Sequence, residues 1–166
     1  MNYLNIFFFF SILGHFLEST FVKNYNSGIL YGYWTPIYGL GVVIILLFNQ
    51  FLKKKIKKTW IRYILLFFLS AITLATMEYI GGYIIEELFH QVFWNYQDHK
   101  ANIGRYTSIE MSIIWGISSI LVALIVDPIA EKYSKKVPNW ISYILLILLI
   151  VDCLLTINNK IISFLG

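Results

Sequence analysis

Charged residues are scarce in this sequence, and cysteine and proline are scarcer still. Only 13% of the 166 residues are Asp, Glu, Lys or Arg, about half of the roughly 25% that soluble domains carry. The one cysteine, Cys153, cannot form an intrachain disulfide, and no Cys/His spacing typical of a zinc site is present. The composition therefore excludes a soluble globular domain, a disordered tail and a disulfide-stapled scaffold.

Several sequence motifs of soluble enzymes are missing as well. The chain contains no GxxxxGK[ST] phosphate loop, no GxGxxG, no HExxH and no GxSxG. If ATP drives this protein, another subunit must bind it. The net charge of +4 does not indicate nucleic acid as a partner, because a lysine cluster at residues 53–58 separates two apolar runs. Membrane proteins keep their cytoplasmic anchors at such places.

Long apolar runs make up most of what is present. The hydrophobic fraction is 58%, and the mean hydropathy is +0.70. We therefore predict an all-α fold, a polytopic bundle of about five transmembrane helices in the lipid bilayer, forming one transmembrane domain over residues 1–166. The first run lacks a basic leader and a cleavage site, so we expect a retained helix. The predicted spans are residues 4–22, 34–52, 60–85, 109–129 and 140–157.

The basic residues predict the orientation of the chain. Nine of the thirteen Lys and Arg residues lie in the loops after the second and fourth spans. Because basic loops stay on the cytoplasmic side, the N-terminus is predicted inside and the C-terminus outside. We expect a bacterial plasma membrane. The segments 24–33 and 86–106 mix aromatic and polar residues, which is typical of the membrane–water interface. They are predicted to form a cap on the outer side.

Ionisable residues at membrane depth are the candidate functional groups. Each costs about 2.5–3.5 kcal/mol on insertion scales, so such residues are functional candidates by default. A rise of about 1.5 Å per residue places five of them in the outer leaflet, and a sixth, Asp127, at the inner end of its span as an interfacial residue. The five are His15, Glu18, Glu78, Glu110 and Asp152.

Two interpretations of this polar group stay open. His15 and Glu18 are three residues apart and share one helix face. With Glu78 and Glu110 from facing helices, they could bind a divalent metal ion such as Mn²⁺, Fe²⁺, Zn²⁺ or Mg²⁺. The alternative is a hydrogen-bonded network that shares protons without a metal. Arg105 could hold a phosphate or carboxylate, or it could pair with Asp98 as a structural clamp.

The chain contains, in this order, the motifs Gly14-His15-x-x-Glu18, Pro36-Ile-Tyr38-Gly39-x-Gly41, Trp94-Asn95-Tyr96 and Asn102-Ile-Gly104-Arg105. Their order resembles that of a small membrane-protein family, the type IV ABC-transporter proteins (CmpB-like), to which animal TMEM229-type proteins are similar. The resemblance covers residues 14–116. This chain has Asn95 where the family favours Asp, and it lacks the family's Gly-Pro at Gly32-Tyr33. The residues that carry the resemblance are Gly14, His15, Glu18, Asn26, Gly28, Gly32, Pro36, Tyr38, Gly39, Gly41, Glu78, Trp94, Tyr96, Asn102, Gly104, Arg105, Trp115 and Gly116.

Three functions remain as hypotheses. The first, favoured partly through the resemblance, is a permease-like transport component for a small solute or ion, acting as a homodimer or with a partner membrane or ATPase subunit. The second is an intramembrane enzyme acting on a lipid or lipid-linked substrate, with His15, Glu18 and Glu78 as catalytic residues. The third is a non-catalytic membrane subunit. The predicted substrate-binding residues are Tyr38, Trp94, Asn102, Arg105 and Glu110.

Overall fold

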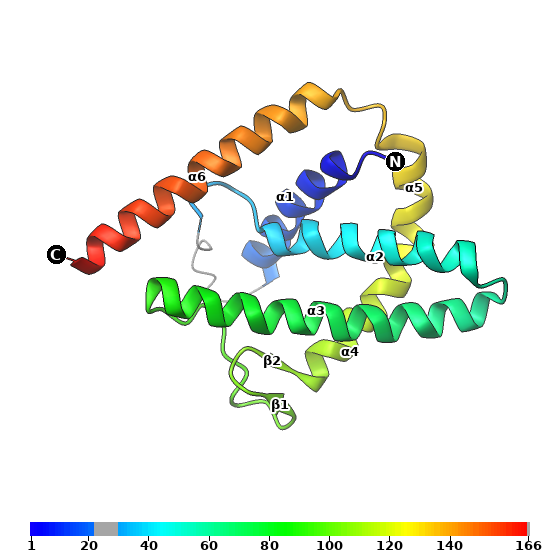
Figure 1. Cartoon of the computed structure of the whole chain (residues 1–166), viewed down its shortest axis with the longest axis horizontal. Coiled ribbons are helices and arrows are strands. Elements are labelled where there is room, and N and C mark those ends of the chain that lie inside the picture. Colours follow the sequence, from blue (N-terminus) through cyan, green and yellow to red (C-terminus); the bar gives the residue numbers. More distant parts are fainter. Residues whose placement is uncertain (22–29, 166) are drawn as a thin grey trace. The chain divides into compact units, whose positions relative to one another are not determined.

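The computed structural model describes residues 1–21 and 30–165, and Figure 1 shows the order of their elements. The all-α class is confirmed, with one two-stranded hairpin added. Residues 24–29, the first part of the predicted cap, lie outside the described residues. The elements are α1 (Tyr3–Phe21), α2 (Pro36–Lys55), α3 (Thr59–Phe89), β1 (Asn102–Ile103), β2 (Thr107–Ser108), α4 (Ile109–Leu121), the π-helix η1 (Val122–Val126), α5 (Asp127–Tyr133) and α6 (Asn139–Leu165).

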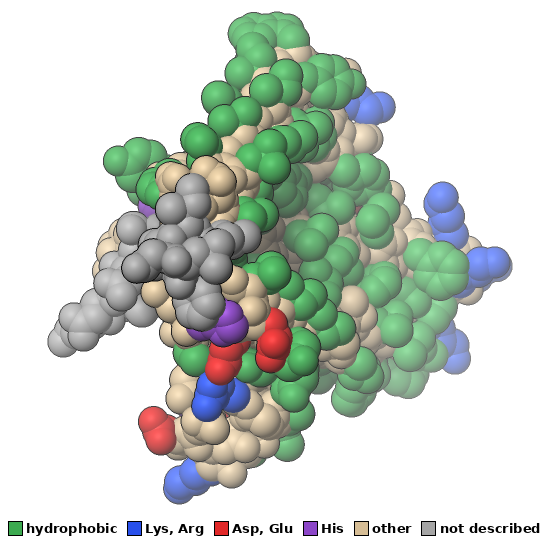
Figure 2. Space-filling model, turned by 60° about the vertical axis from the view of Figure 1, so that its left-hand side comes forward, with side chains coloured by type: hydrophobic (Ala, Val, Ile, Leu, Met, Phe, Trp, Pro, Cys, Tyr) green, Lys and Arg blue, Asp and Glu red, His purple; other side chains and the backbone are tan. Residues whose placement is uncertain are grey.

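Four helices among the described residues are long and apolar enough to cross a membrane. They are Pro36–Lys55, Thr59–Phe89, Ile109–Tyr133 and Asn139–Asn159, and only 22–33% of the apolar window of each is buried. Hydrophobic side chains cover wide areas of the face shown in Figure 2. Exposed apolar surface of this extent needs lipid around it, so this is an integral membrane protein. The fifth span, the topology and the plasma-membrane location stay predictions.

The helix α1 is not among these four candidates. It has 19 residues, which is nearly the length that a crossing needs. Its apolar run contains three polar residues, Asn5, His15 and Glu18. Two of these polar side chains, Asn5 and His15, are buried. These two side chains therefore face protein neighbours.

The chain divides into two compact units, and the first combines residues 1–40 with residues 130–166. Here the start of α1 is tied to the turn before α6. The amide of Asn5 donates to the carbonyl oxygens of Ser134 at 2.7 Å and Val137 at 2.9 Å, and the Ser142 hydroxyl donates to its Oδ1. Every hydrogen-bonding group of the buried Asn5 side chain thus has a partner, as burial requires.

Two glycines of the first unit allow α1 and the start of α2 to approach closely. A Cβ on Gly39 would lie 2.2 Å from the Phe7 carbonyl oxygen and 2.2 Å from Ser11 Oγ. A Cβ on Gly14 would lie 2.6 Å from the Tyr38 ring. Small residues at such contacts are typical of helix pairs in membranes. Tyr38 therefore lies against α1.

The second unit covers residues 41–129, and α3 packs on α4 within it. The ring of Phe67 fills the space beside Gly116, where a Cβ would lie 2.5 Å away. Leu66 is fully buried in this core. The helix α3 runs through Gly81 and Gly82 and ends where His90 takes a left-handed φ of 50°. Its last turns therefore extend past the predicted end of the third span.

A short hairpin connects α3 to α4 within the second unit. The strands β1 and β2 pair antiparallel, with Asn102 opposite Ser108 and Ile103 opposite Thr107. Gly104 makes the turn with a φ of 68°, a conformation that glycine adopts without strain. Ser108 then caps α4, because its Oγ accepts a hydrogen bond from the Met111 N–H at 3.2 Å. The hairpin places residues 105–108 beside α3.

Candidate functional site

The Glu78 carboxylate is the most completely enclosed acidic group among the predicted site residues. Its side chain is 6% exposed, on the face of α3 that the hairpin and α4 cover. Tyr96 Oη donates to Oε1 at 2.9 Å, and Thr107 Oγ1 donates to Oε2 at 2.9 Å. Trp115 Nε1 lies 3.4 Å from Oε2. All three donors are neutral, so they hold the carboxylate in place without cancelling its charge.

A second acidic group, Glu86, lies near the end of α3. Arg105 Nη1 donates to its Oε1 at 2.6 Å, and Tyr106 Oη donates to its Oε2 at 2.5 Å. Charge-assisted bonds of this length are among the stronger ones in proteins. The alternative pairing of Arg105 with Asp98 is wrong, because the turn at Gly104 brings the guanidinium to α3. Asp98 stays exposed in the loop before β1.

Tyr106 connects these two carboxylate sites. Its ring packs on Gly82, where a Cβ would lie 2.7 Å from the ring, and against Tyr79 with the ring centroids 5.5 Å apart. Its carbonyl oxygen accepts a hydrogen bond from Trp94 Nε1 at 3.0 Å. Glu78, Gly82 and Glu86 are spaced four residues apart and form one stripe on α3. We call the stripe and its partners from the hairpin and α4 the Glu78–Glu86 site.

The environment of Tyr106 predicts an alkaline titration. The hydrogen bond to Glu86 raises the pKa of the Tyr106 phenol, because the neutral form donates and the phenolate would be repelled. The stabilisation from this proton is complete below the ordinary phenol pKa and is lost as the pH rises through the raised value. The phenolate absorbance of wild type minus Tyr106→Phe should therefore appear above the ordinary range. In Glu86→Gln the pKa of Tyr106 should fall back toward the ordinary phenol value. A titration curve identical to that of the wild type would contradict the role of Glu86.

The first unit holds the other predicted acid and its neighbours. Tyr38 Oη donates to Glu18 Oε1 at 2.8 Å, and the same tyrosine ring lies on Gly14. His15 is buried, with its ring edge-to-face against Tyr33 at 5.5 Å between centroids. The motif around residues 14–18 thus places His15 and Glu18 beside residues 33–38.

Asp152 on α6 holds the segment before α2. Its two oxygens accept hydrogen bonds from the backbone N–H groups of Tyr31 at 2.9 Å and Gly32 at 2.7 Å. Trp34 Nε1 donates to it at 2.8 Å, and Thr156 Oγ1 donates at 3.2 Å. Because all four of these hydrogen bonds hold the segment before α2 or lie within α6, they explain the buried carboxylate of Asp152 as a structural group.

The predicted substrate-binding residues have separate surroundings. Asn102 donates to the Gln97 carbonyl oxygen at 2.9 Å and so stabilises the hairpin itself. Glu110 lies in the first turn of α4, and its Oε2 is buried without a hydrogen-bond partner. Trp94 and Arg105 surround Tyr106 and Glu86 in the second unit, whereas Tyr38 belongs to the first. Their role in substrate binding stays a prediction.

The divalent-metal reading also stays a prediction. Within residues 1–21 and 30–165, no three His, Cys, Asp or Glu side chains are grouped as ligands of one metal ion. His15 and Glu18 belong to the first unit, whereas Glu78 and Glu110 belong to the second. The structure therefore describes the surroundings of each pair only within its own unit.

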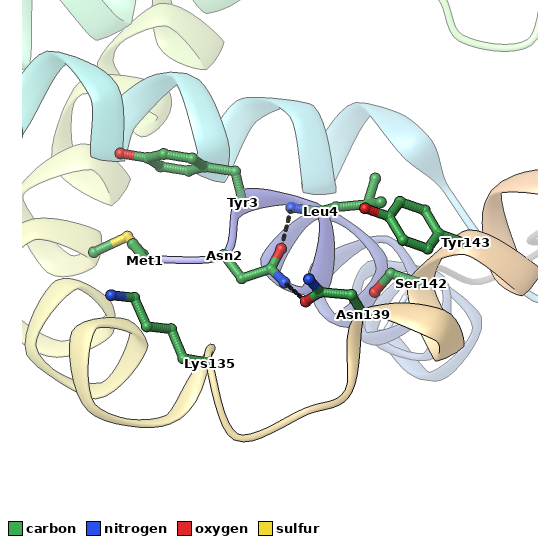
Figure 3. Close-up of a pocket in the computed structure, with 8 residues that line it drawn as sticks. All are labelled: Met1, Asn2, Tyr3, Leu4, Lys135, Asn139, Ser142 and Tyr143. Carbon is green, nitrogen blue, oxygen red and sulfur yellow. Dashed lines mark hydrogen bonds between the residues drawn. The ribbon is translucent and has the colours of Figure 1, made fainter.

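A cavity of about 490 Å³ lies in the first unit, away from the predicted residues. Figure 3 shows it between the starts of α1 and α6. Asn2 Nδ2 donates to Asn139 Oδ1 across it at 2.6 Å, and the Asn2 side chain also accepts from the Leu4 N–H at 3.2 Å. Its walls include Lys135 and Ser142. None of the predicted site residues lines it.

Sequence analysis missed several partners of the Glu78–Glu86 site. Glu86, Tyr106 and Thr107 were part of the predicted cap or outside the predicted set. The four-residue spacing from Glu78 through Gly82 to Glu86 was the signal that could have found the stripe. Sequence analysis placed Asp127 at the interface, which stays a prediction, and gave it no protein partner. The Asp127 side chain is fully buried and pairs with Lys53 from α2, because α2 approaches it within the second unit.

Comparison with known proteins agrees with the order of the motifs. A family model described as "Putative ABC-transporter type IV" matches residues 5–157. No curated protein and no solved structure matches the chain. The family match includes α1 through most of α6, with both sets of acidic residues. The chain therefore belongs to the ABC-transporter type IV (CmpB) membrane-protein family.

Proposed function

We propose that this protein is a permease-like membrane component of a transport system for a small solute or ion, and that Glu78 accepts and releases a proton or cation during transport. The family description supports a role in transport. The observation that carries the proposal is the buried Glu78 carboxylate with three neutral hydrogen-bond donors. Carboxyl groups at membrane depth mark ion and substrate pathways.

The energetics of burial favour a functional role for this carboxylate. A charge taken out of water is costly unless an opposite charge accompanies it. Arg105, the basic residue of the hairpin, forms its ion pair with Glu86. Binding of a proton or of a cation would therefore stabilise the buried Glu78 carboxylate.

The origin of the donors gives a way to couple binding to movement. Tyr96 comes from the loop before β1 and Thr107 from β2, whereas Trp115 comes from α4. Hydrogen bonds to an ionised carboxylate are about twice as strong as bonds between neutral groups. When a proton or cation neutralises Glu78, its hold on Tyr96 and Thr107 weakens. Binding of a proton or cation to Glu78 would thus weaken the attachment of the hairpin to α3. A ligand that binds one arrangement of the hairpin better than another shifts the population toward that arrangement.

The source of energy would be either a partner ATPase subunit or an ion gradient. The sequence has no phosphate loop for ATP, and proteins of the ABC class work with ATPase subunits or domains. We therefore propose a partner ATPase subunit, or transport driven by an ion gradient through Glu78. A homodimer would supply the additional helices that a pathway between bundles needs.

Proton flux in proteoliposomes tests the role of Glu78. The full chain is reconstituted with a pH-sensitive dye inside, and a potassium diffusion potential drives proton entry. We expect Glu78→Gln to lower the flux by about tenfold or more, because an amide cannot exchange a proton at this pH. Glu78→Asp keeps the carboxylate and should retain part of the flux.

The matched control is Glu87→Gln, which makes the same change at an exposed position of the same helix. Its flux should equal that of the wild type. If the wild type moves neither protons nor added cations above empty liposomes, and Glu78→Gln changes nothing, the proposal fails. A membrane lipid profile altered by wild type but not by Glu78→Gln would instead support the lipid-enzyme hypothesis.

A further inference from the structure

A second buried polar cluster lies in the second unit, between α2 and the start of α5. It consists of Asn49, Lys53 and Asp127, and the Glu78–Glu86 site does not include it. We propose that the side-chain oxygens of Asp127 and Asn49 form a binding site for a small monovalent cation such as Na⁺. In this proposal the Lys53 ammonium group competes with that cation for the same carboxylate.

The two oxygen-bearing side chains are entirely enclosed. Asp127 and Asn49 are each 0% exposed. Asn49 Nδ2 donates to Asp127 Oδ2 at 2.9 Å, and Lys53 forms an ion pair with the same oxygen. One carboxylate oxygen thus receives both donors.

The other side-chain oxygen of Asp127 and the side-chain oxygen of Asn49 are candidate ligands of a cation. Asp127 Oδ1 and Asn49 Oδ1 are both buried, and neither accepts a hydrogen bond. A buried acceptor left without a partner is destabilising, and native proteins contain few of them. Carboxylate and amide oxygens are the ligands that hard cations prefer. A cation between these oxygens would satisfy both.

The backbone before Asp127 is also unusual. The chain forms a π-helix over Val122–Val126, and the Asp127 N–H bonds back to the Val122 carbonyl oxygen. Pro128 follows and has no N–H to continue an α-helix, so a wider turn precedes it. Single π-turns inside longer helices are frequent at functional sites. This feature marks the same residue independently of the unpartnered oxygens.

Charge balance explains why Lys53 and a cation would exclude each other. Asp127 and Lys53 together are neutral, so a cation added to both would leave an uncompensated positive charge in a buried place. The Lys53 side chain is 40% exposed, and its flexible stem can carry the ammonium group into water. Binding of the cation therefore requires departure of Lys53.

Thermal unfolding of the full chain in detergent tests the site, with Na⁺ as the probe and choline replacing it at constant ionic strength. Lys53→Met removes the competing ammonium group and should raise the apparent affinity for Na⁺ by about tenfold or more. The reason is that the lysine no longer lowers the fraction of molecules whose Asp127 is free to bind Na⁺. Tm should therefore rise at lower Na⁺ concentrations than in wild type. Lys53→Met/Asp127→Asn should show no specific response to Na⁺.

The matched control is Lys54→Met, which removes the same charge from an exposed neighbouring position. It should respond like wild type, and Glu78→Gln should as well, which separates this site from the proposed transport function. If Lys53→Met does not fold, Lys53→Gln replaces it, since glutamine keeps a polar end. Equal stabilisation by Na⁺ and choline in these variants, or a Na⁺ response that survives Asp127→Asn, would overturn the proposal.

Discussion

Replacement of Asp152 by alanine is expected to lower the free energy of unfolding by about 3 kcal/mol or more. The carboxylate is 7% exposed and accepts four hydrogen bonds. Two of the donors are backbone N–H groups of residues 31 and 32, which cannot rotate toward another acceptor. Alanine would remove the acceptor of both partly buried bonds, and a hydrogen bond to a charged group contributes about 1.5–3 kcal/mol. Chemical denaturation in detergent micelles measures the loss.

Two further variants make the Asp152 experiment specific. Asp152→Asn keeps one acceptor oxygen at nearly the same volume, so its loss should be intermediate. Asp98→Ala removes a carboxylate from an exposed position in the second unit and should change the free energy of unfolding by less than about 0.5 kcal/mol. If Asp152→Ala were as stable as Asp98→Ala, the four bonds would not anchor the segment before α2.

The second large effect is expected at Gly39. A methyl group there would lie 2.2 Å from both the Phe7 carbonyl oxygen and Ser11 Oγ. The serine can rotate, but the carbonyl oxygen belongs to the backbone of α1 and can yield only if the helix moves. Overpacking of this kind costs about 1–3 kcal/mol, and occasionally more. Gly39→Ala should therefore lower the midpoint of thermal unfolding by several degrees.

Gly41 provides the control for Gly39 in the same helix. A Cβ on Gly41 would make ordinary contacts with Leu74, at 3.6 and 3.9 Å. Alanine in a helix interior is better than glycine by about 0.5–1 kcal/mol. Gly41→Ala should therefore be neutral or stabilising by the same measurement. A similar loss in both variants would mean that the close approach of α1 at Gly39 is not what limits the substitution.

Much of the fold could be predicted because a membrane helix is encoded locally. Twenty consecutive apolar residues favour a spanning helix whatever the rest of the chain does. The lysines after Leu52 and the proline at 36 mark the two ends of α2 in the same local way. The surroundings of helix α1 are harder to predict from the sequence. Its phenylalanines indicate contact with lipid, whereas Asn5 and His15 are buried against protein.

The partners within the sites could not be predicted in this way. The tie between Glu86 and Arg105 depends on the turn at Gly104, where a hairpin replaces the expected irregular cap. Asp127 was expected at the membrane surface beside Lys132. Its burial follows from a π-turn and from contact with α2, which is more than seventy residues away in the sequence. Interactions that distant leave no periodic signal in one sequence.

The division of the chain has a consequence for the order in which it assembles during synthesis. The second unit is one continuous segment, residues 41–129, so it can close as soon as it has left the ribosome. The first unit needs residues 130–166 as well as residues 1–40. Until then the Asn5 side chain has none of its partners at Ser134, Val137 and Ser142. In a nascent chain halted before α6, α1 would therefore lack these hydrogen-bond partners, and the first unit could not be completed.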